Sequence, residues 1–271
     1  MPKVSLITPL YNSKKWFSQT IDSVLSQELS DFEWLVVNDG STDGSEALIS
    51  NEADPRIRFF SQENRGVSAA RNVALEHAQG DYVAFLDADD TLPTRSLQVR
   101  SSYLDGNPQI GFVDGVVRFM NKDLSVEIRR SSPSRCTVEL YEKLVDLNER
   151  FFSASSYMIR RSLIEQAQFP IGVTHAEDLV FFLRVAWKSR ALYSSVLEPT
   201  YIYRTGHGSA MQNLDGLEAG YLEFLNVAEN ECALPKRRVR ATKRRIQLMM
   251  LKSWLRTGRP VRACRSFVRF S

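Results

Sequence analysis

The sequence has little cysteine and no long apolar run. Its 271 residues include only three cysteines, Cys136, Cys232 and Cys264, which lie far apart. This spacing fits neither a disulfide framework nor a zinc site, so we expect reduced thiols and a cytoplasmic protein. No stretch approaches the roughly 18 apolar residues that a membrane-spanning helix needs. The N-terminal PKVSLITPLYN is typical of a strand and not of a secretion signal.

Glycine-rich phosphate loops are missing as well. Neither G-x-x-x-x-G-K-[ST] nor G-x-G-x-x-G occurs in the chain. These are the patterns in which backbone amides bind nucleotide phosphates after a strand. Their absence argues against a dinucleotide-dependent dehydrogenase.

The last 36 residues contain no acidic side chain. Thirteen of the 35 Lys and Arg lie in 236–271, which leaves 22 basic against 32 acidic residues in 1–235, a balance of −10. Within 236–256, apolar residues recur at roughly helical spacing: Val239, Ile246, Met249, Met250 and Trp254. An amphipathic basic helix predicts peripheral attachment to an anionic membrane surface. Packing of this helix against the acidic remainder of the chain is the alternative. No nucleic-acid-binding motif accompanies the charge.

Two periodicities alternate along the first hundred residues. Apolar and β-branched runs predict strands at 3–8, 33–38, 56–61 and 81–86, and helical spacing predicts helices at 13–27, 44–51 and 67–80. Repeated strand–helix units predict an α/β protein with a mostly parallel sheet flanked by helices. Farther along, the pattern predicts a strand at 110–120, helices at 137–150, 176–189, 214–230 and 236–256, and a pair of strands in 191–204 turned at Pro199.

A polar cluster follows each of the first four expected strands. The clusters are TPLYN (8–12), NDGSTDGS (38–45), QENRGVSAARN (62–72) and DADD (87–90). Ligands of parallel sheets bind beyond the carboxyl ends of the strands. The four clusters therefore predict one shared site, although NDGSTDGS alone is also a good turn sequence.

The DADD cluster places Asp87, Asp89 and Asp90 within four positions. Such clustered carboxylates repel one another unless a positive group lies among them. Carboxylates suit Mn²⁺ or Mg²⁺, with substrate phosphates completing the coordination. The spacing of a calcium-binding EF-hand is missing. A purely structural acidic turn remains the alternative.

Taken together, these motifs resemble the family 2 inverting glycosyltransferases. The resemblance rests on VSLITPLYNSKKWFSQTIDSVLSQ, DFEWLVVNDGSTDGS, NRGVSAARNVAL, GDYVAFLDADD and AEDLVFFLR, and it covers residues 3 to about 92 and then patches to about 210. It implies a GT-A fold, which is Rossmann-like, with a basic helical extension at the C-terminus. The expected units are a GT-A domain at 1–213, with a donor half at 1–105 and an acceptor half at 106–213, and the extension at 214–271.

The resemblance also implies roles for individual residues in binding a nucleotide-sugar, which we expect to be a UDP-sugar. Thr8, Pro9 and Tyr11 would border the nucleotide, Asp39 would pair with the uracil ring, and Arg71 would lie near the base. Asp87 would contact the ribose, next to Ala88, and Asp89 would bind the Mn²⁺ or Mg²⁺ that bridges the diphosphate. His207 would be a further metal ligand, while Arg204 and Ser209 would contact phosphate.

Inverting transfer needs a base, and the resemblance assigns that role to Asp178, with Glu177 as the rival. Both would otherwise be acids favourably placed at a helix N-terminus. The acceptor would be a hydroxyl of a glycan or a lipid-linked oligosaccharide in cell-surface polysaccharide synthesis, presented at the inner face of the cytoplasmic membrane. Two other functions stay open: a nucleotidyltransferase of related fold, and a nucleotide-sugar-binding module without activity.

Overall fold

The computed structural model describes residues 1–134, 136–148, 154–206 and 213–270. Its strands are β1 (Val4–Leu10), β2 (Phe32–Asp39), β3 (Ile57–Gln62), β4 (Tyr82–Phe85), β5 (Ile110–Met120), β6 (Glu127–Arg130), β7 (Val138–Glu139), β8 (Met158–Arg160) and β9 (Leu192–Arg204). Its helices are α1 (Lys14–Leu25), α2 (Glu46–Ser50), α3 (Val67–His77), α4 (Ser96–Gly106), α5 (Leu140–Val145), α6 (Glu177–Ser189), α7 (Leu214–Asn226), α8 (Lys236–Arg256) and α9 (Pro260–Arg269). A π-helical turn, Val227–Glu231, continues α7.

One mixed sheet runs through the molecule in the order β3-β2-β1-β4-β8-β5-β9-β7, and β6 pairs with β5. The strands β3, β2, β1 and β4 are mutually parallel, as are β5 and β9. The short strand β8 lies antiparallel between β4 and β5 and joins these two parallel groups. The predicted mostly parallel α/β architecture is therefore confirmed.

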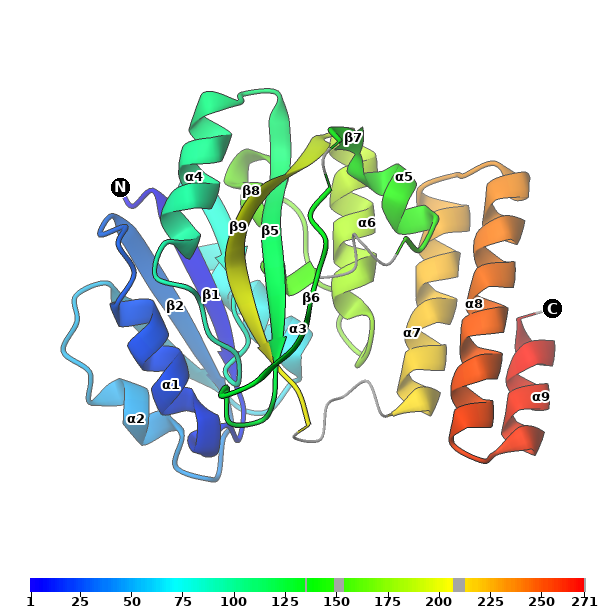
Figure 1. The fold of residues 1–271 in the computed structure, drawn as a ribbon, viewed down its shortest axis with the longest axis horizontal. Coiled ribbons are helices and arrows are strands. Elements are labelled where there is room, and N and C mark those ends of the chain that lie inside the picture. The colour runs from blue at the N-terminus through cyan, green and yellow to red at the C-terminus, as the bar shows by residue number, and fades with distance from the viewer. Residues whose placement is uncertain (135, 149–153, 207–212, 271) are drawn as a thin grey trace.

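Helices cover both faces of this sheet (Figure 1). Alternate residues of β2 show why: Trp34 and Val36 enter one apolar cluster with α1 and α4, whereas Leu35 and Val37 enter another with α3 and α6. Side chains of a strand point to opposite faces in turn, so a strand buried on both sides must be apolar throughout.

Two predictions about local structure were wrong, and one helix was missed. Residues 192–204 form one strand, not a pair, because Pro199 lies at a register shift opposite Val116, where a bulge tolerates a residue without an N–H. The helical segment predicted at 137–150 is the short strand β7 followed by α5. Helix α4 was not predicted, because its serines and the buried Arg100 weaken the apolar periodicity.

The three C-terminal helices lie side by side, with α9 outermost (Figure 1). The apolar face of α8 is buried: Val239, Ile246, Met250 and Trp254 join the same cluster as Phe85 and Phe181. Thus α8 packs against the rest of the chain, the alternative left open by the sequence. Among the helices of the described ranges, none has the length and apolar character required to cross a membrane.

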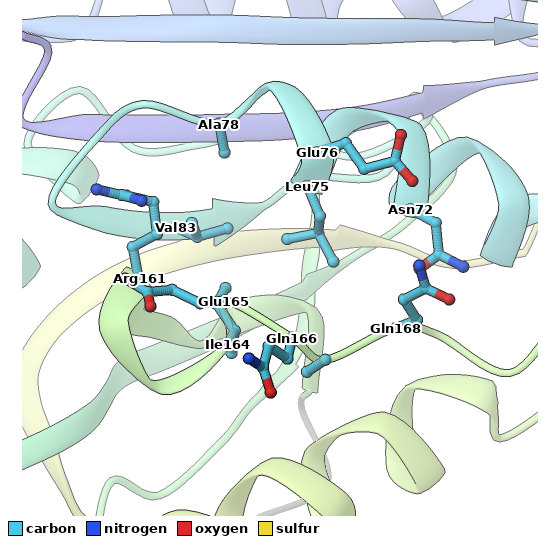
Figure 2. Close-up of a pocket in the computed structure, with 11 residues that line it drawn as sticks. Asn72, Leu75, Glu76, Ala78, Val83, Arg161, Ile164, Glu165, Gln166 and Gln168 are labelled. Carbon is cyan, nitrogen blue, oxygen red and sulfur yellow. The ribbon is translucent and has the colours of Figure 1, made fainter.

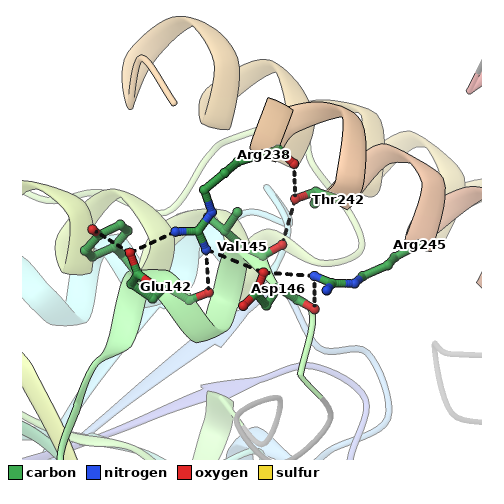
Figure 3. A network of polar contacts seen from close by, with 7 residues as sticks. Glu142, Val145, Asp146, Arg238, Thr242 and Arg245 are labelled. Atoms are coloured by element: carbon green, nitrogen blue, oxygen red, sulfur yellow. Dashed lines mark hydrogen bonds and ion pairs between the residues drawn. The ribbon is translucent and has the colours of Figure 1, made fainter. Parts of the chain in front are cut away.

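Ion pairs fix the contact between α8 and α5 (Figure 3). Arg238 lies 2.8 Å from Glu142 and 3.4 Å from Asp146, and Arg245 lies 2.9 Å from Asp146. Between them, the Thr242 hydroxyl donates to the carbonyl of Val145 at 2.8 Å. The acidic body and the basic extension therefore attract each other at this contact.

Candidate active site

The carboxyl ends of β1, β2 and β4 bring the polar clusters to one edge of the sheet. Hydrogen bonds join the loop after β1 to the loop after β2: the Asn12 amide donates to Ser41 Oγ at 3.1 Å, and the Thr42 amide donates to Asn12 Oδ1 at 2.8 Å. Gly40 permits this geometry, since its φ is +73° and an added Cβ would lie 2.8 Å from the Asn64 nitrogen. The two loops thus support each other next to Asp39.

Asp39 lies at the end of β2 and is buried. Its Oδ1 accepts from Gln62 Nε2 at 2.7 Å and from the Arg65 amide at 2.8 Å, and its Oδ2 accepts from the Gly66 amide at 2.8 Å. A carboxylate offers about four acceptor positions. Three are used here, so Oδ2 keeps capacity for one further donor.

Asp90 is a structural member of the acidic turn. Its carboxylate is buried and accepts from the Tyr201 hydroxyl at 2.8 Å and from the Arg204 amide at 2.7 Å. Burial raises the pKa of Asp90 well above its usual range, and the carboxylates of Asp89 and Asp87 add to that rise. Asp90 therefore joins the turn to β9 and faces away from any ligand.

Arg204 is likewise internal, which corrects the expectation that it contacts phosphate. Its side chain is buried, and its guanidinium donates to the Asp89 carbonyl at 2.6 Å, the Lys122 carbonyl at 2.7 Å and Gln19 Oε1 at 2.8 Å. These hydrogen bonds engage the Arg204 guanidinium and hold the DADD turn in place. His207 and Ser209 lie outside the described residues.

Arg71 connects the acidic turn to α6. Its guanidinium lies 2.9 Å from Asp87 Oδ1 and 2.8 Å from Glu177 Oε1, and it packs over the Phe169 ring at 5.2 Å. Only 6% of its side chain is exposed. Burial by itself would lower the pKa of Arg71, but Asp87, Glu177 and Asp178 outweigh it and raise the pKa. The expected role of Arg71 near the base is not tested by these contacts.

Asp178 differs from its neighbour Glu177. Glu177 is paired with Arg71, whereas no ion pair of Asp178 occurs among the described residues. Burial raises the pKa of Asp178 to about 7, and the Glu177 carboxylate contributes in the same direction. Arg71 and the Leu179 amide, which donates to Asp178 Oδ1 at 2.7 Å, oppose that rise. A carboxylate with a pKa near neutrality can both take and release a proton.

The other predicted donor-site residues differ in exposure. Thr8 is fully buried, and its hydroxyl accepts from Trp34 Nε1 at 2.9 Å. Tyr11 is 52% exposed, and Pro9 and Asp89 are half-buried. Ala88 is buried, and its carbonyl accepts from Thr20 Oγ1 at 3.0 Å.

The chemistry of these donors fits a divalent ion that is shared with a ligand. Within the described ranges, no three His, Cys, Asp or Glu side chains come together as a ligand set. Asp87 is paired with Arg71, and the Asp90 carboxylate accepts from the Tyr201 hydroxyl within the protein. Mg²⁺-type sites commonly use one or two carboxylates and complete the shell with substrate phosphates.

A cavity of about 240 Å³ lies elsewhere, between the end of α3 and the segment after β8 (Figure 2). Two of its polar side chains are engaged within the protein: Asn72 Nδ2 donates to the Phe169 carbonyl at 3.0 Å, and Arg161 Nε donates to the Gly80 carbonyl at 2.8 Å. The carboxylates of Asp39, Asp87 and Asp178 do not line it. We therefore place the functional site at the strand ends.

Comparison with known proteins identifies the family of this chain. Residues 5–167 match the family described as Glycosyl transferase family 2. The chain belongs to this family. It is thus a glycosyltransferase with the GT-A fold.

Its relatives include two bacterial proteins of similar length. An uncharacterized glycosyltransferase of Haemophilus influenzae is 33% identical over 68% of this chain and 71% of its own. The putative teichuronic acid biosynthesis glycosyltransferase TuaG of Bacillus subtilis is 42% identical over 71% of this chain and 75% of its own. Other relatives are longer, and the chain spans 33% of one from Rickettsia bellii.

Two solved structures share the fold of this glycosyltransferase. TarS 1–349 of S. aureus in complex with UDP-GlcNAc has a TM-score of 0.70 and 21% identity, covering 89% of this chain and 71% of that one. The mannosyltransferase PcManGT of Pyrobaculum calidifontis, in complex with GDP-Man and Mn²⁺, has a TM-score of 0.63 and 21% identity, covering 99% and 74%.

The sequence did not reveal the contacts among these residues. Glu177 was considered as a rival base or as an acid at a helix N-terminus, yet it is the partner of Arg71, 106 positions away. Ser155, whose hydroxyl donates to Asp87 Oδ2 at 3.3 Å, and Tyr201 carried no motif. A single hydroxyl-bearing residue is too common in a sequence to identify a site.

Replacement of Arg71 by methionine should destabilise this glycosyltransferase strongly. Methionine keeps an apolar stem beside Phe169 but leaves Asp87 and Glu177 without their cation, which typically costs about 3–5 kcal/mol. Urea denaturation would measure the free energy of unfolding. The matched control is Arg95→Met, because the Arg95–Glu28 pair is 62% and 50% exposed and such pairs contribute at most about 1 kcal/mol. Equal, small losses for both variants would show that the Arg71 pairs are not important for stability.

Proposed function

We propose that this family 2 glycosyltransferase transfers a sugar, with inversion, from a UDP-sugar to a hydroxyl of a cell-surface glycan or lipid-linked acceptor. The observation that supports it most is the double ion pair of Arg71, which holds Asp87 of the acidic turn beside the helix that carries Asp178. Two similar proteins are consistent with this proposal: TuaG is named for teichuronic acid biosynthesis, and TarS is in complex with UDP-GlcNAc. Residues 1–213 would be the catalytic unit and 214–271 its extension.

The donor would lie across the ends of β1, β2 and β4. Asp39 Oδ2 would accept the N–H of a uracil edge, Asp87 would contact the ribose, and Pro9 and Tyr11 would border the nucleotide. Asp89 would hold a Mn²⁺ or Mg²⁺ ion, with His207 as a further ligand. When bound, the ion stabilises negative charge on the leaving diphosphate.

Asp178 would remove the proton from the acceptor hydroxyl as the sugar carbon is attacked from the face opposite the diphosphate. Its two features, the lack of a described ion pair and a pKa of about 7, suit a base better than Glu177, whose charge is used by Arg71. Inversion would turn an α-linked donor into a β-linked product. Arg71 would hold Glu177 and Asp87 so that donor and base keep their relative positions.

UDP binding tests the donor assignment. Calorimetry with Mn²⁺ should detect UDP binding that falls at least tenfold when the metal is chelated, and Asp89→Asn should show the same loss with metal present. GDP is the comparison ligand, since a structural neighbour binds GDP-Man. Preference for GDP would refute the uracil assignment for Asp39, and failure to bind either nucleotide would refute the donor site.

The pH dependence of turnover tests the base. Asp178 must be ionised to accept a proton, so kcat should fall about tenfold per pH unit below a pKa of about 7. The charged and titratable groups near it are Glu177, Arg71, Asp87, Tyr157 and Tyr221.

Asp178→Asn should lower kcat by about 10²–10⁴-fold and leave UDP affinity within twofold. The matched control is Asp215→Asn, another acid in the first turn of a helix, but 58% exposed. Full activity of Asp178→Asn would eliminate this mechanism.

For the extension, we propose attachment to the inner face of an anionic cytoplasmic membrane. The buried face of α8 cannot serve, so the contact would use the exposed residues of α8 and α9. Five apolar side chains are exposed there: Leu248, Leu255, Val261, Phe267 and Val268. Eight exposed basic residues have no ion pair with any described residue: Lys236, Arg237, Arg240, Arg244, Lys252, Arg256, Arg259 and Arg265.

Co-sedimentation with vesicles tests this attachment. Each Lys or Arg near an anionic surface contributes about 1 kcal/mol, so Lys252→Glu with Arg265→Glu should weaken binding to phosphatidylglycerol-containing vesicles roughly thirtyfold or more. Arg95→Glu with Lys188→Glu changes the net charge equally on the body and should have little effect. Equal binding of both double variants, or equal binding to neutral phosphatidylcholine vesicles, would contradict the proposal.

A further inference from the structure

Helix α7 packs closely against the turn that precedes α6. Gly216 and Gly220 lie four positions apart, on one side of α7. A Cβ on Gly220 would lie 1.9 Å from the carbonyl oxygen of His175 and 3.2 Å from the Ala176 Cβ. A Cβ on Gly216 would lie 2.3 Å from His175 Nδ1. Only glycine allows α7 to approach this turn so closely.

Glycine within a helix is otherwise unfavourable. Each costs about 1 kcal/mol relative to alanine, and α7 has two in thirteen residues. Gly106, at the end of α4, has no atom within 4 Å of an added Cβ. The close contact is therefore a property of Gly216 and Gly220 and not of helical glycines in this chain generally.

The turn under α7 is the one that orients the proposed base. Ala176 precedes α6 with φ of +56°, a left-handed conformation that a residue with a side chain adopts at a cost. Surrounding contacts must hold it there, and the His175 carbonyl and the Ala176 side chain face α7. Glu177 and Asp178 follow directly in the first turn of α6.

The same helix packs against the first turn of α6. Tyr221, next to Gly220, is buried in one apolar cluster with Leu179 and Val180 of α6. Burial raises the pKa of Tyr221 to about 12, and the Asp178 carboxylate contributes in the same direction. Elsewhere, α7 is held by Glu218, which accepts from Trp254 Nε1 at 3.4 Å and pairs with Arg269 at 3.1 Å.

We propose that α7 is a positioning element of the transfer reaction, in which Gly216 and Gly220 fix the His175–Ala176 turn so that Asp178 meets the acceptor hydroxyl. This inference rests on the proposed role of Asp178. It makes the first helix of the C-terminal extension part of the catalytic unit, although none of its residues need touch the substrate.

The first test compares Gly220→Ala with Gly106→Ala. The assay follows UDP release from UDP-GlcNAc with Mn²⁺ and water as acceptor, and calorimetry follows UDP binding. Gly220→Ala should displace the turn and lower kcat per folded molecule about 10–100-fold, since shifts near 1 Å can cost about 10². The KM for UDP-GlcNAc and the affinity for UDP should stay within twofold. Gly106→Ala should match the wild type in kcat, in KM for UDP-GlcNAc and in affinity for UDP.

A second variant covers the case in which Gly220→Ala does not fold. In Gly216→Ala the new methyl group meets the His175 ring, which can be removed. We expect Gly216→Ala to lower kcat. The double variant Gly216→Ala with His175→Ala should have a kcat at least tenfold higher than that of Gly216→Ala. His175→Ala alone completes the double-mutant cycle. Unchanged kcat in folded Gly216→Ala would overturn the inference, as would a loss of UDP affinity that equals the loss of kcat.

The outcomes separate this inference from the proposed function. Normal turnover by the wild type and by both glycine variants would refute the role of α7 only. Failure of the wild type to bind UDP, or full activity of Asp178→Asn, would refute the proposed function itself.

Discussion

The double ion pair of Arg71 is the interaction on which the site depends. One buried guanidinium joins three segments that are distant in sequence: α3, the turn after β4 and the first turn of α6. A buried charge is tolerated only with close partners of opposite sign, and three surrounding carboxylates keep this cation charged. They in turn need the cation, because without it the acids at the strand ends would repel those of α6. The active-site edge of the sheet is thus held together by charge balance around one side chain.

The C-terminal helices extend this arrangement and are not a separate appendage. Phe224 of α7, Ile246 and Trp254 of α8, and Ala263 of α9 share one apolar cluster with Phe85 of the sheet. Because α8 also forms ion pairs with α5, the extension is attached by both apolar and charged contacts. The basic charge that remains exposed is therefore presented on a rigid support.

Local sequence patterns predicted much of the architecture. Runs such as Leu35–Val37 are apolar on both faces and therefore identify buried parallel strands. The polar clusters at their ends then indicated a candidate site, since parallel strands end at a common edge. Amphipathicity found α8 but not what covers it, because a membrane surface and a protein core select the same apolar stripe.

Contacts between distant segments could not be predicted in this way. The positive partner of the DADD cluster was expected to be a metal ion on Asp89, since no basic residue lies within the cluster. The structure supplies Arg71 from α3 as well, and it turns Asp90 inward to Tyr201 of β9. Nothing in the spacing of DADD distinguishes its three acids, because their difference is created by β9, more than a hundred residues later.

Asp87 and Glu177 share the Arg71 guanidinium, so a change at one of these carboxylates affects the other. A ligand that draws Asp87 away from Arg71 leaves more of the positive charge to Glu177 and Asp178, and so lowers the proton affinity of Asp178. Linkage then requires that loss of the Asp178 proton strengthen the binding of that ligand by the same factor. Ligand binding at the strand ends and protonation of Asp178 on α6 are therefore thermodynamically coupled.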